Sequence, residues 1–197
     1  MSPIEISLVV LAYILGSFSS AVIVCRLMKL PDPRTLGSKN PGATNVLRHG
    51  GKKAAFLTLC FDVLKGIIAV LIARSVTNEP LVLASVTFVV FIGHLYPIFF
   101  GFRGGKGVAT SFGGLVVLVW PVGLSTLAVW LTIAFVFGYS SLAALVAAFL
   151  SPMLMYWFSG EPYYILTSFL MSSLLIWRHR SNIRDLIHGK EDKISDE

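Results

Sequence analysis

Glycine, serine, asparagine and basic residues gather at residues 37–53, GSKNPGATNVLRHGGKK, between two apolar segments. The glycines let the backbone approach a ligand closely, and successive backbone N–H groups in such turns form anion-binding concavities. Ala43 can begin a short helix whose N-terminus adds further N–H donors. The other residues that we expect to contribute are Ser38, Asn40, Gly42, Thr44, Asn45 and Arg48. The pattern favours a phosphate cradle over a flexible connection, because a linker needs no proline, asparagines and paired glycines so close together.

A second basic, glycine-rich stretch, GHLYPIFFGFRGGKGVAT, covers residues 93–110. Lys106 is followed by glycine, so the G-x-x-x-x-G-K-[ST] spacing of a Walker A loop is missing, which argues against a nucleoside triphosphate. Lys106 and the backbone amides of Gly104 and Gly105 are suited to hold a phosphate ligand. His94 lies one to two helical turns before this loop. We assign it to the same site, with a purely structural hydrogen-bonding role as the alternative.

The third basic stretch, RHRSNIRD, covers residues 178–185 and directly follows an apolar segment. His179 and Asn182 are three residues apart, so both side chains can lie on the same face of a helix. An electrostatic flank of a membrane segment is the alternative, but it does not require this pair. Arg, Lys, His, Ser and Asn on glycine-rich backbone suit a phosphate-bearing ligand, and more than one phosphate.

Several kinds of site are missing from the sequence. No carboxylate cluster with the ligand spacing of a Mg²⁺ site and no Cys/His set for tetrahedral zinc accompanies the basic stretches, so we expect neither a metal nor a cofactor. The two cysteines, Cys25 and Cys60, lie in apolar runs and are interpreted as buried free thiols. No nucleic-acid partner is expected.

The rest of the chain is apolar enough to place these stretches beside a membrane. Of 197 residues, 55% are hydrophobic and 13% are charged, with a mean hydropathy of +0.79, whereas soluble domains are about 25% charged. The apolar runs approach the roughly 20 residues of a spanning helix and do not alternate as barrel strands do. We therefore predict an all-α, polytopic integral membrane protein, with one helical domain at residues 1–187 and a charged, disordered cytoplasmic tail at 188–197.

Seven apolar segments can be placed: 4–25, 54–73, 81–100, 108–120, 124–139, 142–158 and 163–177. Seven transmembrane helices are the prediction, with five as the alternative, because the fourth and fifth segments are short enough to form one bent span. Fourteen of the 16 Lys and Arg residues fall in the three basic regions, and the other two are Lys65 and Arg74. The positive-inside rule then puts these regions and the C-terminus in the cytoplasm and the N-terminus outside.

Asp62 and Lys65 interrupt the second apolar segment. Ionisable residues within a membrane are costly, usually face the interior of the helix bundle and are often paired. Their spacing allows a pair on one helix face. Two interpretations stay open, a buried ion pair that fixes this helix and a role facing the substrate.

Three motifs in this order, GSxNPGATNxxR, HxxPxFxxFRGGKGVAT and RHxxNI, resemble the bacterial acyl-phosphate:glycerol-3-phosphate acyltransferases. The similarity extends to the SSA of the first apolar segment and to YSSLAAL at 139–145. The resemblance implies a seven-helix, monomeric enzyme of the bacterial inner membrane with its active site on the cytoplasmic side. Such an enzyme transfers an acyl group from acyl phosphate to the 1-hydroxyl of sn-glycerol 3-phosphate, the first acylation of phospholipid synthesis. The products are lysophosphatidic acid and inorganic phosphate.

The resemblance also implies roles for individual residues. Ser38, Gly42, Ala43 and Ser141 would bind acyl phosphate. The residues that would bind glycerol 3-phosphate are Arg48, His94, Lys106, His179 and Asn182. Lys39 departs from the family pattern, because many relatives have glycine there, and it would add charge beside the phosphate pocket.

The mechanism must do without a local His–Asp base. None of the four histidines, at positions 49, 94, 179 and 188, is followed by aspartate five residues later. An acyl phosphate is a mixed anhydride with a good leaving group, so we expect catalysis by positioning and charge neutralisation, with a phosphate oxygen of the donor taking the hydroxyl proton and no acyl-enzyme. For the acyl chain, Gly16, Ser17 and Ser20 predict either a groove open to lipid or simply close helix packing.

Two other classes of protein fit the sequence less well. An anion transporter usually binds its substrate near the midplane between repeats, whereas these polar stretches share one interface and no repeat is present. A scaffold for anionic lipid headgroups would not need the paired His and Asn.

Overall fold

The structure, a computed structural model, describes residues 1–194, and every regular element in that range is helical. This confirms the all-α prediction. The elements are α1 (Pro3–Gly16), α2 (Ser20–Leu27), α3 (Ala43–Val76), α4 (Pro80–Leu95), the 3₁₀ turn η1 (Ile98–Phe100), α5 (Val108–Leu118), α6 (Trp120–Phe137), α7 (Ser140–Phe158), α8 (Pro162–Arg178) and α9 (Arg180–Ile187).

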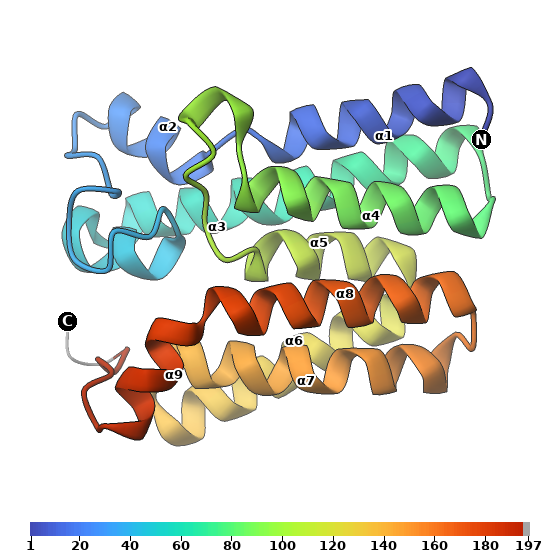
Figure 1. Ribbon diagram of the computed structural model, residues 1–197. Coiled ribbons are helices and arrows are strands. Elements are labelled where there is room, and N and C mark those ends of the chain that lie inside the picture. Colours follow the sequence, from blue (N-terminus) through green and yellow to red (C-terminus); the bar gives the residue numbers. More distant parts are fainter. Residues whose placement is uncertain (195–197) are drawn as a thin grey trace.

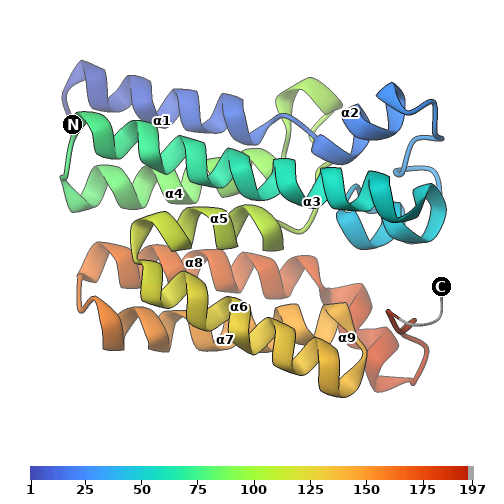
Figure 2. The same cartoon turned by 180° about the vertical axis from the view of Figure 1, so that it is seen from behind.

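The long helices lie side by side in two groups, with α5 between them (Figures 1 and 2). One group contains α1, α3 and α4, and the other contains α6, α7 and α8. The short α5 packs against α3, α4 and α6, while α4 also contacts α8 directly. The N-terminus and the C-terminal region lie at opposite ends of this bundle (Figure 1).

Within residues 1–194, four helices are long and apolar enough to cross a membrane, namely α3, α4 with η1, α6 and α7. A fifth span results if α1 and α2, which are bent by 44° at a short break, are counted as one. α5 has 11 residues and α8 has 17, fewer than the roughly 20 that span a bilayer without tilt or thinning. Every predicted apolar segment therefore contains a helix, while length and composition identify four or five spans.

The fourth and fifth apolar segments form two separate helices. Val119 caps the end of α5 and the start of α6. The chain reverses there, so the two helices run antiparallel (Figures 1 and 2). Gly123 lies so close to Val116 that a Cβ atom at Gly123 would collide with the Val116 backbone. One bent span is therefore wrong for this pair.

α1 packs closely on α4 just before the break in the first apolar segment. A Cβ atom on Gly16 would overlap the carbonyl of Val90, and one on Gly93 would overlap the carbonyl of Tyr13. Gly16, Ser17 and Ser20 do not line the cavity described below. All three residues are buried, which favours the alternative interpretation, close helix packing.

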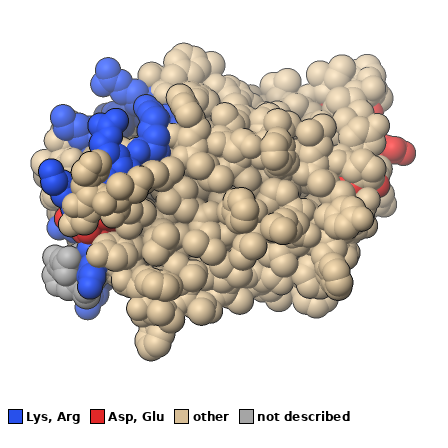
Figure 3. All heavy atoms as spheres, turned by 60° about the horizontal axis from the view of Figure 1, so that its bottom comes forward, with Lys and Arg blue, Asp and Glu red and all other residues tan. Residues whose placement is uncertain are grey.

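On the face seen in Figure 3, the Lys and Arg side chains gather at one end of the molecule. The loop between α2 and α3, the loop between α4 and α5, and α9 all lie at this end (Figure 1). The three basic stretches therefore share one side of the bundle, as the charge distribution predicts.

The predicted tail does not extend away from the domain as a disordered segment. The backbone N–H of Lys190 donates to the carbonyl of Asp185 at 2.8 Å, and that of Ile194 donates to the carbonyl of Gly138 at 2.8 Å. These bonds fold residues 188–194 back onto the start of α7. Residues 195–197 of the predicted tail lie outside the described range.

Candidate active site

Residues of all three basic stretches line one cavity of about 370 Å³. The cavity lies at the basic end of the bundle and continues between α5, α6, α7 and α8. The predicted site residues in its wall are Ser38, Asn40, Gly42, Ala43, Thr44, Asn45, Arg48, Asp62, His94, Lys106, Ser141, His179 and Asn182. Gly104, Gly105 and Lys65 were predicted with them but are not part of this wall. The tertiary structure thus unites residues that are up to 144 positions apart in the sequence.

In the described part of the chain, three helices begin at the cavity without a side-chain cap. These are α3 after Gly42, α5 after Gly107 and α7 after Tyr139. The first N–H groups of a helix have no intrahelical partner, and a helix N-terminus carries partial positive charge. The first residues of each helix line the cavity, Ala43 of α3, Val108 of α5 and Ser140 of α7 among them. Their convergence gives the polar end of the cavity a positive potential that favours anions.

Asn45 holds the loop before α3 in place. Its buried side chain donates to the carbonyls of Pro33 at 2.8 Å and Leu36 at 3.2 Å. Its Oδ1 accepts the backbone N–H of Ser38 at 3.3 Å. These bonds fix the loop that carries Ser38 into the cavity wall.

Lys39 has a left-handed backbone, with φ of 56°. Glycine adopts this conformation without steric cost, so a glycine at this position would fit the same backbone. The Lys39 side chain is exposed and does not line the cavity. The expected charge beside the phosphate pocket therefore lies outside the cavity wall.

Lys106 reaches into the polar end from the loop before α5. Its Nζ donates a short hydrogen bond to Oδ1 of Asn182, which joins the second and third motifs. Burial lowers the pKa of Lys106 to about 8, with Arg178 and Arg48 acting in the same direction and Glu191 opposing them. The ammonium group is therefore mainly charged at neutral pH and loses its proton just above it.

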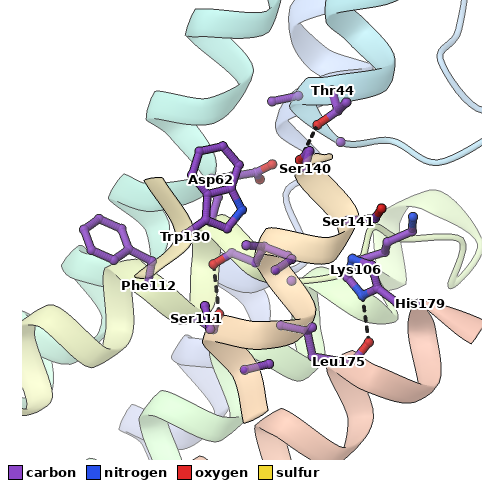
Figure 4. Close-up of a pocket in the computed structure, with 18 of the residues that line it drawn as sticks. Thr44, Asp62, Lys106, Ser111, Phe112, Trp130, Ser140, Ser141, Leu175 and His179 are labelled. Carbon is purple, nitrogen blue, oxygen red and sulfur yellow. Dashed lines mark hydrogen bonds between the residues drawn. The ribbon is translucent and has the colours of Figure 1, made fainter. Parts of the chain in front are cut away.

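His179 is a neutral ring at neutral pH. Burial, followed by the positive charge of Lys106, lowers the pKa of His179 to about 4. Its Nδ1 lies 2.8 Å from the carbonyl of Leu175 (Figure 4). A carbonyl can only accept, so Nδ1 carries the proton by inference from this partner. The other nitrogen, Nε2, is left as an acceptor.

The two serines at the start of α7 have different surroundings. Ser140 Oγ is 3.3 Å from Thr44 Oγ1 and ties α7 to α3 (Figure 4). Ser141 Oγ is buried and has no hydrogen-bond partner within residues 1–194. A buried unpaired hydroxyl is costly unless a ligand or water bonds to it. Ser141 is thus the serine with bonding capacity left for a ligand.

Asp62, Lys65 and His94 form a buried cluster between α3 and α4. Lys65 Nζ is 2.8 Å from Asp62 Oδ1 and 2.8 Å from His94 Nδ1, and it donates to the carbonyl of Phe18 at 3.0 Å. The ion pair thus braces α3 against α4 and against the α1–α2 break, as the structural interpretation of the pair predicts. Asp62 and His94 also form part of the cavity wall.

Gly104 and Gly105 position Lys106. Their carbonyls accept hydrogen bonds from the guanidinium of Arg178 at 2.8 and 3.0 Å. A Cβ atom on Gly104 would overlap the His94 carbonyl, and one on Gly105 would overlap the His94 ring. The loop therefore wraps closely around the end of α4. The anchoring role of Arg178 was not predicted, although the residue begins the RHxxNI motif.

The other end of the cavity is apolar and was not predicted from the sequence. Its wall comes from α5, α6, α7 and α8, which supply Phe112, Leu115, Leu127, Trp130, Leu131, Ala144, Ala147 and Met171. Phe112 and Trp130 lie across the cavity from Lys106 and His179 (Figure 4). The small residues of the SSLAAL stretch could have indicated this apolar space, because alanines on α7 leave room beside α6. A cationic end and an apolar end thus belong to one continuous cavity.

Comparison with known proteins assigns this arrangement to a family. A model of the glycerol-3-phosphate acyltransferases matches residues 6–189. The chain belongs to the glycerol-3-phosphate acyltransferase family. A family member from Methylococcus capsulatus is 52% identical over 192 residues, covering 98% of this chain and 97% of the relative. One from Yersinia pestis is 47% identical over 197 residues, covering 100% of this chain and 90% of the relative.

Two solved structures of PlsY, an integral membrane glycerol 3-phosphate acyltransferase, have the same fold. The glycerol 3-phosphate form superimposes with a TM-score of 0.91 and 38% identity, covering 96% of this chain and 94% of that one. The lysophosphatidic acid form gives a TM-score of 0.89 and 37% identity, with the same coverage. The family member described here is therefore an integral membrane protein with the fold of PlsY.

The buried ion pair gives a prediction about stability. Asp62→Ala leaves Lys65 buried without its carboxylate partner, and losing one member of a buried pair costs about 3–5 kcal/mol. We expect a large drop in the unfolding temperature of the purified protein in detergent. Asp62→Leu combined with Lys65→Met removes both charges and should recover most of this loss. A single variant as stable as the parent protein would contradict the bracing role.

Proposed function

We propose that this acyltransferase uses acyl phosphate as its donor. It transfers the acyl group to the 1-hydroxyl of sn-glycerol 3-phosphate and releases lysophosphatidic acid and inorganic phosphate. The observation that carries the proposal is the two-ended cavity. The donor needs an apolar space for its chain and an anion site for its phosphate, and the acceptor needs a second anion site within bonding distance.

The charged side chains of the polar end suit glycerol 3-phosphate. Arg48, Lys106 and Asn182 supply charged and neutral donors for its phosphate. The neutral His179 supplies an acceptor, Nε2, that can align a glycerol hydroxyl, and His94 completes the wall. PlsY in its glycerol 3-phosphate form has the same fold, which supports binding of that substrate here.

The loop before α3 and the start of α7 suit the phosphate of the donor. Ser38, the Gly42–Ala43 backbone and the unpaired hydroxyl of Ser141 offer neutral donors, backed by the uncapped N-termini of α3 and α7. Asn40 and Thr44 support the same wall. The acyl chain would then extend between α5, α6 and α7 toward the bilayer.

The chemical step needs positioning more than acid–base catalysis. The glycerol hydroxyl oxygen attacks the acyl carbon, the bond from that carbon to the phosphate oxygen breaks, and phosphate leaves with the bonding electrons. A phosphate oxygen of the donor takes the hydroxyl proton, so neither a dedicated base nor an acyl-enzyme is required. Lys106 and the helix N-termini stabilise the negative charge that moves onto the leaving phosphate.

We also propose seven crossings, an external N-terminus and a cytoplasmic active site in a bacterial inner membrane, with the monomer as the active unit. Lys and Arg at one end of the bundle support this orientation. Cysteines introduced at Ser2 and at Lys190, in a Cys25→Ser/Cys60→Ser protein, test it. An impermeant thiol reagent applied to intact cells should label the first position and spare the second, and the reverse pattern would contradict the topology.

Two substitutions test the site. Lys106→Ala and His179→Ala should each lower turnover by several orders of ten, measured as lysophosphatidic acid formed from acyl phosphate and labelled glycerol 3-phosphate by purified protein. Lys53→Ala, which changes an exposed lysine at the start of the long apolar part of α3, is the control and should retain activity. A membrane scaffold would tolerate all three changes.

Three outcomes would overturn parts of the proposal, two in that assay and one in a transport assay. Absence of lysophosphatidic acid with acyl phosphate, but its formation with an acyl thioester, would refute the donor. A burst of phosphate release ahead of product would indicate an acyl-enzyme. Phosphate transport by reconstituted vesicles, without acyl transfer, would favour the transporter.

The pKa of Lys106 predicts how the reaction depends on pH. Because this pKa is lowered to about 8, the Lys106 side chain is mainly charged below pH 8 and loses its charge above that pH. The ratio kcat/KM for glycerol 3-phosphate, which reports the free enzyme, should fall by about tenfold per pH unit above that value. Lys106→Arg keeps its charge, so any activity it retains should show no such fall. A profile of the parent protein that stays level to pH 9.5 would exclude an essential Lys106 charge.

A further inference from the structure

The segment after α9 lines the polar end of the cavity and is hydrogen-bonded at both of its ends. It turns at Gly189, where φ is 64°, and the N–H of Lys190 then donates to the Asp185 carbonyl at 2.8 Å. At its far end Ile194 donates to the Gly138 carbonyl at 2.8 Å, and Lys193 Nζ lies 5.7 Å from the centre of the Tyr139 ring. Residues 190–194 therefore form a strap between α9 and the start of α7.

The two acidic residues of this strap bond to the polar end of the cavity. Both carboxylate oxygens of Glu191 accept from Nδ2 of Asn182, at 2.8 and 3.1 Å. A carboxylate oxygen of Asp192 lies 3.3 Å from Nη1 of Arg48, and the Asp192 carbonyl accepts from Nη2 at 3.2 Å. Both acidic residues belong to the cavity wall. Two carboxylates thus contact donors that the proposed function gives to a phosphate.

A carboxylate and a phosphate compete for the same donors. Each offers anionic oxygens to guanidinium and amide N–H groups, and two anions at one cluster of donors repel each other. We propose that Glu191 and Asp192 occupy the glycerol 3-phosphate subsite in the unliganded protein and must be displaced by the substrate's phosphate. The strap thereby sets the apparent affinity for glycerol 3-phosphate. This inference rests on the proposed function of Arg48, Lys106 and Asn182.

The strap is held weakly enough to be exchanged. Asp192 is exposed and Glu191 is half-buried, and exposed ion pairs contribute little because water and salt screen them. Displacing the strap therefore costs glycerol 3-phosphate, a dianion, only a modest part of its own binding free energy. We expect the strap to change substrate affinity by about two- to tenfold, the range of one weak ion pair and its hydrogen bonds.

The kinetic test neutralises the strap without shortening it. Glu191→Gln with Asp192→Asn should lower KM for glycerol 3-phosphate by about two- to tenfold at low salt, and the difference should shrink as salt rises. Glu79→Gln with Glu161→Gln makes the same change in net charge where α4 and α8 begin, at the other end of the bundle, and should leave KM unaltered. An unchanged or raised KM for the strap variant, or loss of its activity at saturating substrate, would overturn the proposal.

A cross-linking test measures the position of the strap directly and does not depend on catalysis. A Cβ atom built on Gly138 lies 3.9 Å from Cβ of Lys193, within the range of a disulfide. Gly138→Cys with Lys193→Cys, in a Cys25→Ser/Cys60→Ser protein, should form this disulfide under mild oxidation. Inorganic phosphate or glycerol 3-phosphate should slow its formation, whereas chloride at matched ionic strength should not. Gly138 has φ of 79°, a backbone conformation that strains cysteine, so the test uses double-variant protein that keeps its activity. In that protein, failure to cross-link would overturn the position of the strap, and a rate that ignores bound phosphate would overturn its displacement.

Binding measured by calorimetry separates the proposed glycerol 3-phosphate subsite from the proposed role of the strap. If glycerol 3-phosphate binds the Lys106→Ala variant as tightly as the parent protein, the proposed subsite itself is wrong. If binding depends on Lys106 but is the same for the parent and the Glu191→Gln/Asp192→Asn variant, the subsite stands and the strap proposal alone is wrong. Binding that needs Lys106 and tightens in the strap variant supports both.

Discussion

The convergence of three uncapped helix N-termini on one cavity is the constraint around which the structure is arranged. Unpaired N–H groups at the starts of α3, α5 and α7 are costly unless water or an anion bonds to them. α5 can begin there only because the glycine loop folds tightly over His94 and is bonded by Arg178. The reversal at Val119 then places α6, and with it the apolar wall of the cavity. The polar end of the cavity, suited to phosphate, and its apolar end, suited to an acyl chain, thus depend on where the same helices begin.

A membrane setting changes which contacts hold this arrangement together. Many large apolar side chains face outward, Phe135 and Trp157 with 92% and 82% of their surface exposed, so burial of apolar surface between helices contributes less than in a soluble protein. Close approach at small residues takes its place, as at Gly66, where a Cβ atom would overlap the Thr110 carbonyl of α5. The buried contacts of Lys65 add a polar brace that joins α3 to α4 and to the break between α1 and α2.

Much of the fold could be predicted, because apolar length and charge position are local properties. The seven apolar segments are helical, and the basic stretches lie together at one end. The departures have non-local causes. The first segment breaks where the Phe18 carbonyl accepts from Lys65, 47 residues away in the sequence. The segment after α9 is ordered because Glu191 and Ile194 find partners on α9 and at the start of α7, which its charged composition does not reveal.

The sequence by itself determined the class of protein, the side on which its polar chemistry gathers and the residue types suited to phosphate, because composition and motif spacing carry that information directly. Only the tertiary structure decided which of those residues share a wall. Lys106 meets Asn182 across 76 positions and Thr44 meets Ser140 across 96. It also decided that His179 is neutral, that Ser141 has no hydrogen-bond partner among residues 1–194, and that the apolar end of the cavity adjoins the cationic end. Partners, burial and pKa depend on how distant helices pack, and no local pattern encodes that packing.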